Sequence, residues 1–309
     1  MLKVKEKLIY TGFGFTIQSD LLLPELSSSA NRNLPIDINI YEKDLTYLWR
    51  ELSDNEFGFT FDNKDVYFKI PDLAIFGILN GHEIQYSPIR ETDFDMIRLF
   101  VLGTCMGVIL MQKKILPLHG SAIEIEGKAY CIVGESGAGK STLASYFLKS
   151  GYKLLSDDVI PITMQNGYPY VTPSYPQQKL WQESLNYFGM KKEEYKSIFG
   201  RTDKFSVPVS SNFITQPLPL GGIIELVKTD NHLSIESMEG FNRFKVLLNH
   251  TYRNFLIPSL NLTSWHFSYS AAILNQVGVY SLNRPISRYT APELAMNILN
   301  IIGKENVCD

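Results

Sequence analysis

One stretch organises this chain of 309 residues: Gly134-Glu135-Ser136-Gly137-Ala138-Gly139-Lys140-Ser141-Thr142. The apolar run that ends at Val133 predicts a strand before it, and the residues from Ser141 to Lys149 predict a short helix after it. Gly151 is a natural stop for that helix. Two glycines, a lysine and a serine at this spacing, between a strand and a helix, indicate a loop that binds nucleotide phosphates.

The residue types of the loop explain why it suits a triphosphate. Glycines let backbone N–H groups turn inward and approach phosphate oxygens without a Cβ in the way. The loop opens a helix, whose positive end faces the anion. Lys140 would supply a full positive charge to the outer phosphates, and Ser141 would place a hydroxyl on a magnesium ion. We therefore predict that the chain binds ATP and Mg²⁺.

A pair of carboxylates, Asp157-Asp158, follows Lys140 by only 17 residues. The segment from Lys153 to Ser156 predicts a strand that ends at this pair, so strand, helix and return strand would bring the carboxylates beside the loop. One carboxylate could then hold Mg²⁺ while the other accepts a proton from an attacking hydroxyl. The structural alternative is a polar turn or a helix cap.

Further candidates flank these motifs. A predicted hairpin over residues 121–133 turns at Glu126-Gly127, and His119 stands just before it, either as a structural residue or near the nucleotide. Arg201 and Lys204 lie in a polar loop. A kinase needs extra positive charge on the transferring phosphoryl group, and a mobile loop could bring it. The alternative for both cations is plain surface charge.

The remaining chain reads as a mixture of strands and helices, which indicates an α/β or α+β fold. Residues 1–90 predict mostly strands and turns, and residues 93–113 predict a long, buried apolar helix. We place a domain boundary between them, which gives a strand-rich region at 1–90 and a nucleotide-binding domain at 91–309. Residues 178–199 predict a further helix, and residues 222–227 and 277–282 predict strands.

Composition narrows the class of protein. The chain is 45% hydrophobic and 20% charged, which is ordinary for a folded domain. Its net charge of -3 and its lack of a basic stripe argue against binding to nucleic acid. The N-terminus has no signal-peptide pattern, which predicts a cytoplasmic location. The apolar run from Met96 to Met111 is short and contains Arg98, so we do not expect it to span a membrane. Three dispersed cysteines form neither a disulfide framework nor a zinc pattern.

The stretch from Leu118 to Ile162, with its His-Gly, hairpin, phosphate loop, helix and Asp-Asp in order, resembles the catalytic domain of HPr kinase/phosphorylase. The resemblance implies a kinase core related to that of phosphoenolpyruvate carboxykinases. It also implies that Asp157 is the general base and Asp158 the metal partner. Thr142 replaces a glutamate of that family, its long later signature is missing, and residues 1–90 do not resemble its regulatory domain, so a different acceptor is expected.

The whole chain is more similar to the shorter HPr-kinase-like proteins of lasso-peptide clusters. The similarity lies in the opening Gly14-Phe-Thr-Ile-Gln-Ser-Asp20 with Leu23-Pro-Glu-Leu26, in Lys179-Leu-Trp181, and in the strand from Pro219 to Leu226. It implies phosphorylation of a serine in a peptide or protein, at the C-terminus of a lasso-peptide precursor. HPr kinases are oligomers, which makes a homo-oligomer a candidate assembly. Two alternatives stay open: a kinase for a small hydroxylated metabolite, and a nucleotide-sensing module without catalysis.

Overall fold

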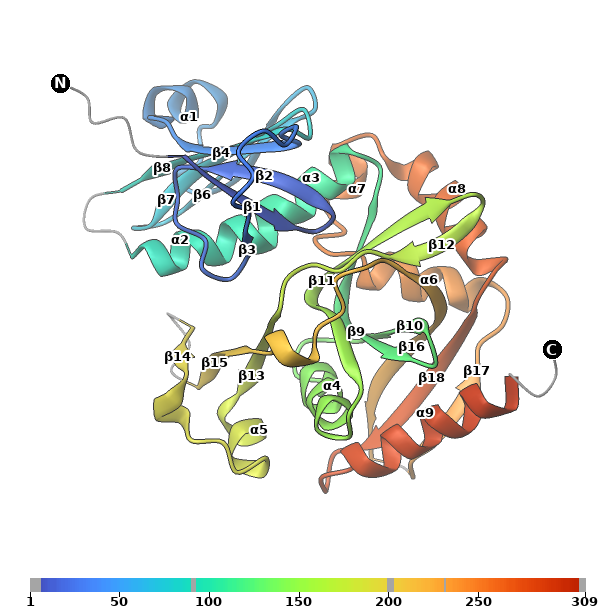
Figure 1. The fold of residues 1–309 in the computed structure, drawn as a ribbon. Coiled ribbons are helices and arrows are strands. Elements are labelled where there is room, and N and C mark those ends of the chain that lie inside the picture. Colours follow the sequence, from blue (N-terminus) through green and yellow to red (C-terminus); the bar gives the residue numbers. More distant parts are fainter. Residues whose placement is uncertain (1–6, 90–92, 199–202, 231, 306–309) are drawn as a thin grey trace.

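The computed structural model describes residues 7–89, 93–198, 203–230 and 232–305, and Figure 1 shows two large sheets with a smaller third one. The first large sheet has eight strands in the order β3-β1-β2-β4-β8-β7-β6-β5. All of them precede residue 89, and the helix α1 (Thr46–Leu52) packs on this sheet through Trp49. The strands are β1 (Leu8–Gly12), β2 (Phe15–Ser19), β3 (Ser27–Ser28), β4 (Ile38–Glu42), β5 (Gly58–Asp62), β6 (Asp65–Ile70), β7 (Ala74–Leu79) and β8 (Glu83–Pro88).

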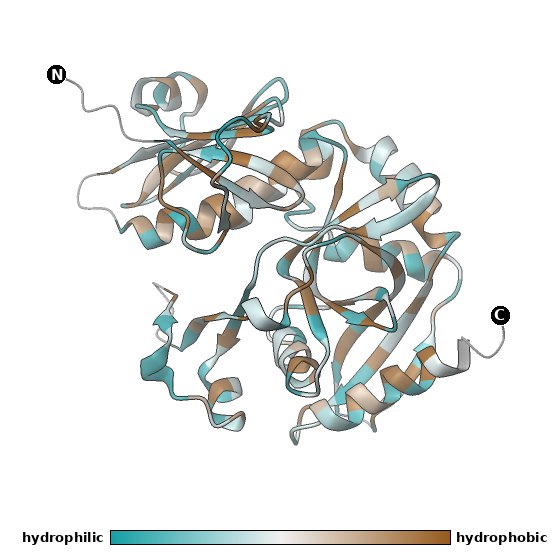
Figure 2. Ribbon diagram, in the orientation of Figure 1, coloured by the Kyte–Doolittle hydropathy of each residue, from teal (hydrophilic) through white to brown (hydrophobic). Residues whose placement is uncertain are grey.

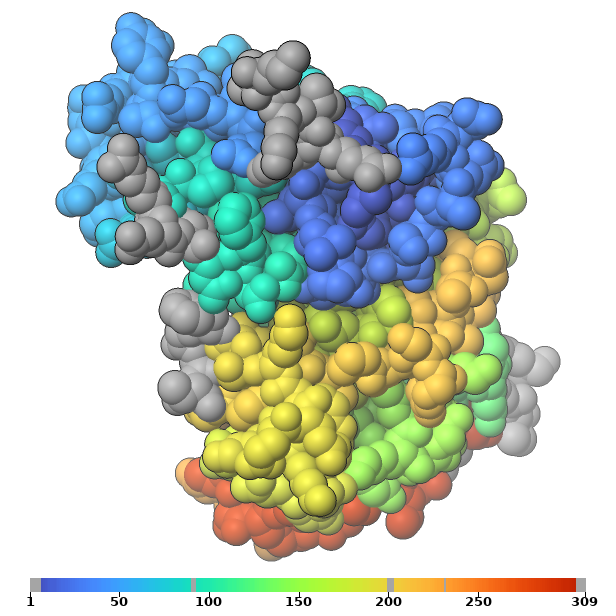
Figure 3. All heavy atoms as spheres, turned by 60° about the vertical axis from the view of Figure 1, so that its left-hand side comes forward, coloured from blue at the N-terminus to red at the C-terminus, as the bar shows by residue number. Residues whose placement is uncertain are grey.

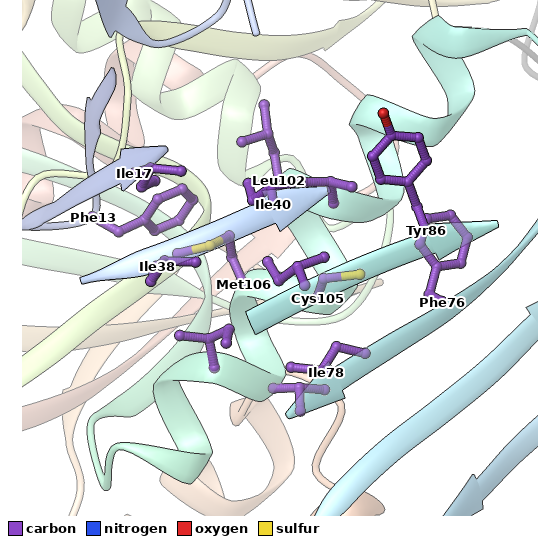
Figure 4. Close-up of a cluster of buried hydrophobic side chains, with 14 of the residues drawn as sticks. Phe13, Ile17, Ile38, Ile40, Phe76, Ile78, Tyr86, Leu102, Cys105 and Met106 are labelled. Atoms are coloured by element: carbon purple, nitrogen blue, oxygen red, sulfur yellow. The ribbon is translucent and has the colours of Figure 1, made fainter. Parts of the chain in front are cut away.

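A long apolar helix closes the core of this first sheet. It consists of α2 (Phe94–Phe100), a π-helical turn η1 (Val101–Cys105) and α3 (Met106–Gln112). Figure 4 shows Leu102, Cys105 and Met106 among the side chains of the strands. Residues 94–112 are apolar and long enough to meet the criterion for a membrane span, but 72% of the most apolar window is buried within the protein. The predicted buried helix is therefore confirmed.

The second large sheet carries the phosphate loop. Its strands run in the order β10-β9-β11-β12-β16-β18-β17, and β10 also pairs in parallel with β16. The predicted hairpin is confirmed, with Glu126 and Gly127 at positive φ in its turn. The strands are β9 (Leu116–Ile125), β10 (Lys128–Val133), β11 (Lys153–Gln165), β12 (Tyr168–Val171), β16 (Leu218–Thr229), β17 (Ser234–Ser237) and β18 (Gly278–Pro285).

Helices cover both faces of the second sheet. On one face α4 (Lys140–Lys149) and α9 (Ala291–Glu305) share a core with β10 and β18, and on the other α6 (Phe241–His250) and α8 (Thr263–Leu274) do so. The short α7 (Leu256–Ser259) packs against the first sheet. In Figure 2 the apolar residues line the interior of these layers. The predicted mixed α/β fold is confirmed.

Two details differ from the expectations. β11 does not end at Asp157-Asp158 but continues to Gln165, because β9 pairs with it from Lys153 to Ile162 and β12 pairs with it from Ile162 to Gln165. Of the helix expected over 178–199, residues 178–198 are described, and only α5 (Gln182–Tyr187) is α-helical. The segments on either side of α5 form strands instead. β13 (Gln177–Trp181) and β14 (Lys196–Ser197) pair with β15 (Lys204–Pro208) in a three-stranded sheet. Short 3₁₀ turns, η2 (Lys192–Glu194) and η3 (Ser210–Asn212), complete this region.

The boundary near residue 90 stays a prediction. The long helix directly after it packs with the first sheet, in a core that also receives Val159, Tyr175, Leu256 and Leu260 from the rest of the chain. The two regions therefore meet across a continuous apolar contact.

The closest backbone approach in the hairpin gives a test of this fold. A Cβ on Gly120 would lie 2.2 Å from the Ile132 carbonyl oxygen, so Gly120→Ala should destabilise the protein by about 3 kcal/mol. Gly303→Ala is the control, because Gly303 lies in α9 with open space around it and alanine should stabilise that helix by about 0.5–1 kcal/mol. Urea denaturation measures both. Equal stability of the two variants would contradict the close approach.

Candidate active site

The phosphate loop follows the C-terminal end of β10, one of three parallel strands, and the other two continue past that end. β10 leads into it, and β16 and β18 run alongside in the same direction. A Cβ on Gly134 would lie 2.6 Å from the Leu226 carbonyl oxygen, so only glycine fits at the start of the loop. Gly137 and Gly139 have φ of 76° and 103°, values that favour glycine, and α4 begins directly after Gly139. The glycines thus allow the backbone of the loop to turn tightly just before the start of α4.

Lys140 is held inside the loop. Its Nζ donates hydrogen bonds to the carbonyl oxygens of Gly134 at 2.8 Å and Glu135 at 2.9 Å. Burial lowers the pKa of Lys140, while Asp157 and Asp158 act in the opposite direction. The ammonium group is thus held beside the loop, and the two carboxylates stabilise its charged form.

Asp157 is buried and its carboxylate accepts three hydrogen bonds. Ser121 donates at 2.5 Å and the loop residue Ser141 at 3.1 Å, both to Oδ1. The backbone N–H of Lys179 donates to Oδ2 at 2.8 Å. Burial raises the pKa of Asp157, although the bonds from Ser121 and Lys179 oppose that shift. This carboxylate therefore sits on the loop serine and is shielded from solvent.

The Asp158 carboxylate lies between the side chains of Lys179 and His119. Lys179 Nζ lies 2.5 Å from its Oδ2, and His119 Nδ1 lies 3.4 Å from Oδ1 and 3.0 Å from the backbone oxygen. Burial alone would raise the pKa of Asp158, but Lys179 and then His119 outweigh it and hold the pKa well below its usual range. Asp158 is therefore ionised throughout the physiological range.

The backbone at Asp158 explains how adjacent strand residues serve one site. Neighbours in a regular strand point to opposite faces. Asp158 has φ of 90°, however, in the region that L-residues rarely adopt, and both carboxylates line the same cavity. Such a strained position persists only where surrounding contacts hold it, and these conformations cluster at functional sites.

This cavity, of about 240 Å³, gathers most of the residues predicted from sequence. Lys204 lines the cavity, and its Nζ lies 5.3 Å from the centre of the Trp181 ring. Thr142 also lines the cavity, and its hydroxyl oxygen lies 2.8 Å from that of Ser184. Arg201 lies outside the described residues. Gly134, Glu135 and Ala138 form the back of the loop rather than the cavity wall. The predicted residues along the wall are His119, Ser136, Gly137, Gly139, Lys140, Ser141, Thr142, Asp157, Asp158 and Lys204.

Two cationic side chains of the cavity, Lys179 and Arg284, are among the lining residues that the sequence does not mark as site candidates. The segment around Lys179 carries only a similarity, and its pattern predicts a helix. Arg284 comes from β18, where its Nε donates to the Ala138 carbonyl oxygen at 2.7 Å and its guanidinium lines the cavity. The pattern around Lys179 carries no phosphate-binding motif, and that around Arg284 is an ordinary strand, so neither position signals its role locally.

The residues present fit a magnesium nucleotide. Mg²⁺ takes one or two protein oxygens and completes its shell with waters and phosphate oxygens. Ser141 and Asp157, joined by a hydrogen bond at the loop, offer those oxygens. In the described part of the chain no cluster of three His, Cys, Asp or Glu side chains could hold a metal without such help.

Comparison with known proteins finds relatives that match about a third of the chain. The chain is 30% identical to an HPr kinase/phosphorylase of Clostridium botulinum over 106 residues, 32% of this chain and 35% of that protein. It is 35% identical to that of Mycoplasmopsis pulmonis over 106 residues, 32% of each chain. It is 37% identical to that of Clostridium tetani over 116 residues, 34% of this chain and 38% of the relative. No family model matches.

The chain thus matches about a third of the length of these curated relatives, and over that part it is a distant homologue of HPr kinase/phosphorylases. Among solved structures, the Hpr(Ser) kinase/phosphatase from Coxiella burnetii aligns with a TM-score of 0.35 and 14% identity. That alignment covers 62% of this chain and 98% of the other.

The Lys179–Asp158 pair predicts a pH-dependent loss of stability. Lys179→Met leaves a buried carboxylate without its cation, which should cost about 3–5 kcal/mol of unfolding free energy at pH 7. In the wild type the lowered pKa of Asp158 contributes stability that is present above pH 4 and lost as pH falls toward the folded pKa. In the variant that pKa rises, so protonation relieves the buried charge and the gap to wild type narrows from pH 7 to pH 4.

Urea denaturation at both pH values measures this effect. Lys196→Met is the matched control, because its Nζ is exposed and lies 3.9 Å from Asp95, where a surface pair contributes about 0–1 kcal/mol. A gap that is the same at pH 7 and pH 4 would contradict the assigned charge pair.

Proposed function

We propose that this protein is a kinase that transfers the γ-phosphoryl group of ATP to the serine hydroxyl of a peptide or protein. One observation carries the proposal: the phosphate loop and two carboxylates with opposite pKa shifts line a single cavity. Binding alone would need the loop but no ionised carboxylate beside it. The distant homology to HPr kinase/phosphorylases over a third of the chain supports phosphoryl transfer as the activity.

The cations of the cavity suit a phosphoryl-transfer site. Lys140, Lys204 and Arg284 reach it from α4, β15 and β18, so positive charge surrounds the place where the outer phosphates would lie. Preorganised charges of this kind stabilise the transition state because they need no reorientation during the reaction. A bound Mg²⁺ would add Lewis-acid stabilisation of the charge on the phosphate oxygens.

The two carboxylates divide the work according to their contacts. The sequence assigned the base to Asp157 and the metal to Asp158, and the contacts favour the reverse. Asp157 is bonded to the loop serine and is only 3% exposed, which suits an oxygen ligand on the metal side better than contact with an acceptor. The side chain of Asp158 is 18% exposed, so an acceptor can reach it, whereas its lowered pKa makes it a weaker base than an ordinary carboxylate.

The reaction then follows from these positions. The acceptor oxygen forms a bond to the γ-phosphorus while the bond from that phosphorus to the β–γ bridging oxygen breaks, and ADP leaves. The hydroxyl proton passes to the Asp158 carboxylate. His119 and Lys179 hold that carboxylate in place from opposite sides, so it does not have to reorient when the acceptor arrives.

As the specific acceptor we propose the C-terminal serine of a lasso-peptide precursor. Its support is the similarity to short HPr-kinase-like proteins, and two of the similar segments, Leu23-Pro-Glu-Leu26 and Lys179-Leu-Trp181, contribute residues to cavities. We also propose that the protein acts in the cytoplasm, where ATP is abundant, and that it assembles into a homo-oligomer.

Removal of the loop lysine tests the kinase itself. Lys140→Ala should lower phosphoryl transfer to serine peptides by about a hundredfold or more, because the phosphates lose a preorganised charge. Lys149→Ala, in the last turn of the same helix and exposed, is the control and should transfer normally. The product is measured by mass spectrometry after incubation with Mg-ATP and synthetic peptides that end in serine. Full turnover by Lys140→Ala would remove the proposal, and a phosphorylated metabolite without modified peptide would change the acceptor.

The division of the carboxylates has its own test, in which nucleotide affinity and turnover are titrated against Mg²⁺. Asp157→Asn should raise the Mg²⁺ concentration for half-maximal turnover and recover partly at high Mg²⁺. Asp158→Asn should keep its Mg²⁺ requirement and nucleotide affinity and lose about 10²–10⁴-fold in turnover at every Mg²⁺ concentration, since an amide accepts no proton. The opposite pattern would restore the assignment made from the sequence.

A further inference from the structure

A second cavity, of about 310 Å³, lies between the N-terminal region and the small three-stranded sheet. Figure 3 turns this side of the molecule forward and shows α2, in teal, facing the segment around β14, in yellow. Residues from the Leu23–Leu26 loop, α2, and strands β13, β14 and β15 form its walls. None of the described residues that line it belongs to the phosphate loop.

The two main walls of this cavity differ in character. α2 and the start of η1 contribute Met96, Leu99 and Leu102, which make an apolar wall. Opposite them lies the polar face of the small sheet, with Gln177 and Ser206. Side chains alternate along strands, and the other face of this sheet packs in a core of its own, formed by Leu180, Leu185, Phe205 and Val207. The polar face is thus the one turned toward the cavity.

Lys179 connects this cavity to the nucleotide site. Its side chain lines both cavities, and its Nζ contacts Asp158 Oδ2 at 2.5 Å. A ligand in the second cavity therefore lies one side chain away from the carboxylate that we place on the acceptor side. This is where an acceptor hydroxyl must arrive to meet the phosphoryl group.

Strand β14 presents its backbone to the same cavity. Five consecutive residues, from Glu194 to Ile198, line it, so both side-chain directions and the main chain between them face it. In the described part of the small sheet, β14 is an edge strand with β15 on one side. Edge strands bind extended peptides by adding a strand, which gives main-chain hydrogen bonds to any peptide sequence. A small metabolite has no peptide backbone to pair with such an edge.

The charges of the cavity favour a basic ligand. Each lysine and arginine among the lining residues already lies near a carboxylate: Arg98 contacts Glu25 Oε1 at 2.9 Å and Asp95, and Lys179 contacts Asp158. The exposed Lys196 lies 3.9 Å from Asp95 Oδ2. Glu25 Oε2 is buried and finds no hydrogen-bond partner among the described residues, and Glu194 lines the cavity with an exposed side chain. A buried carboxylate oxygen without a donor is costly, so a ligand that donates to it gains affinity.

We propose that this cavity, the acceptor cleft, binds an extended peptide segment that carries a lysine or arginine next to its acceptor serine. The inference rests on the proposed kinase function and specifies its substrate. The peptide backbone lies along β14, apolar side chains contact Leu99, and the basic side chain reaches Glu25 and Glu194. The serine hydroxyl is then delivered past Lys179 to Asp158.

Two cleft variants with matched controls test this proposal. Leu99→Arg places a charge in the apolar wall, and Leu248→Arg makes the same change at an exposed leucine of α6 outside both cavities. Glu194→Lys reverses a charge in the cleft, and Glu193→Lys does so at the neighbouring exposed residue, which does not line it. The probes are synthetic serine peptides with Lys, Gln or Glu beside the serine, labelled for fluorescence anisotropy and also incubated with Mg-ATP.

The expected result is at least tenfold tighter binding of the Lys peptide than of the Glu peptide to wild type. Leu99→Arg should weaken all peptides at least tenfold, and Glu194→Lys should remove or reverse the preference for Lys. Both should keep the affinity for a fluorescent ATP analogue, and both controls should behave as wild type. Peptide phosphorylation should change in KM and not in kcat.

The outcomes separate this inference from the proposed function. Peptide phosphorylation with a KM that neither cleft variant changes would overturn the cleft and leave the kinase intact. Peptide binding that the variants weaken, without phosphate transfer by the wild type, would support the cleft and overturn the kinase. Absence of binding by every peptide, with a small metabolite phosphorylated instead, would overturn the cleft and move the acceptor to another class.

Discussion

The Asp157 carboxylate is the contact on which the site depends, because it joins three segments that are separate in sequence. It accepts hydrogen bonds from Ser121 of β9, from Ser141 at the start of α4 and from the backbone of Lys179 in β13. A buried carboxylate is stable only when its oxygens are satisfied, so each donor must remain where it is. The phosphate loop, the hairpin and the small sheet thereby share one fixed point.

The same contact determines where the second carboxylate lies. The N–H of Lys179 is bound to Asp157 while its Nζ is bound to Asp158, so one residue positions both carboxylates. Their environments then push the two pKa values apart: burial raises that of Asp157, and Lys179 and His119 lower that of Asp158. Pairs of titratable groups with divergent pKa values commonly mark separate chemical roles. The divergence separates the roles, and the contacts decide which carboxylate takes which: Asp157 is bonded to the loop serine, and Asp158 has the more exposed side chain.

How much the sequence predicted depended on how local each feature is. The loop, the hairpin and α4 depend on neighbours in the chain, and their patterns identified them. β11 depends on pairing with β9, and β13 on pairing with β15 across a gap of more than 20 residues, so local propensity placed their ends or their type wrongly. Lys179 and Arg284 enter the cavity only through such pairings. The roles of the predicted site residues stay predictions.

The long helix shows why the N-terminal region belongs to the same functional unit. Its start lines the acceptor cleft through Leu99, and its π-helical turn brings Gly103 to the site, where a Cβ would lie 3.0 Å from Tyr252 Oη and 3.8 Å from Asp158 Oδ2. Tyr252 in turn lies against the ring of His119, and burial raises its pKa to about 12, which keeps the phenol neutral beside the carboxylate. π-Turns of this kind cost regular hydrogen bonding and occur frequently at functional sites. Since one helix contacts both the cleft and the surroundings of Asp158, a shift of the first sheet would alter acceptor binding and the environment of that carboxylate together.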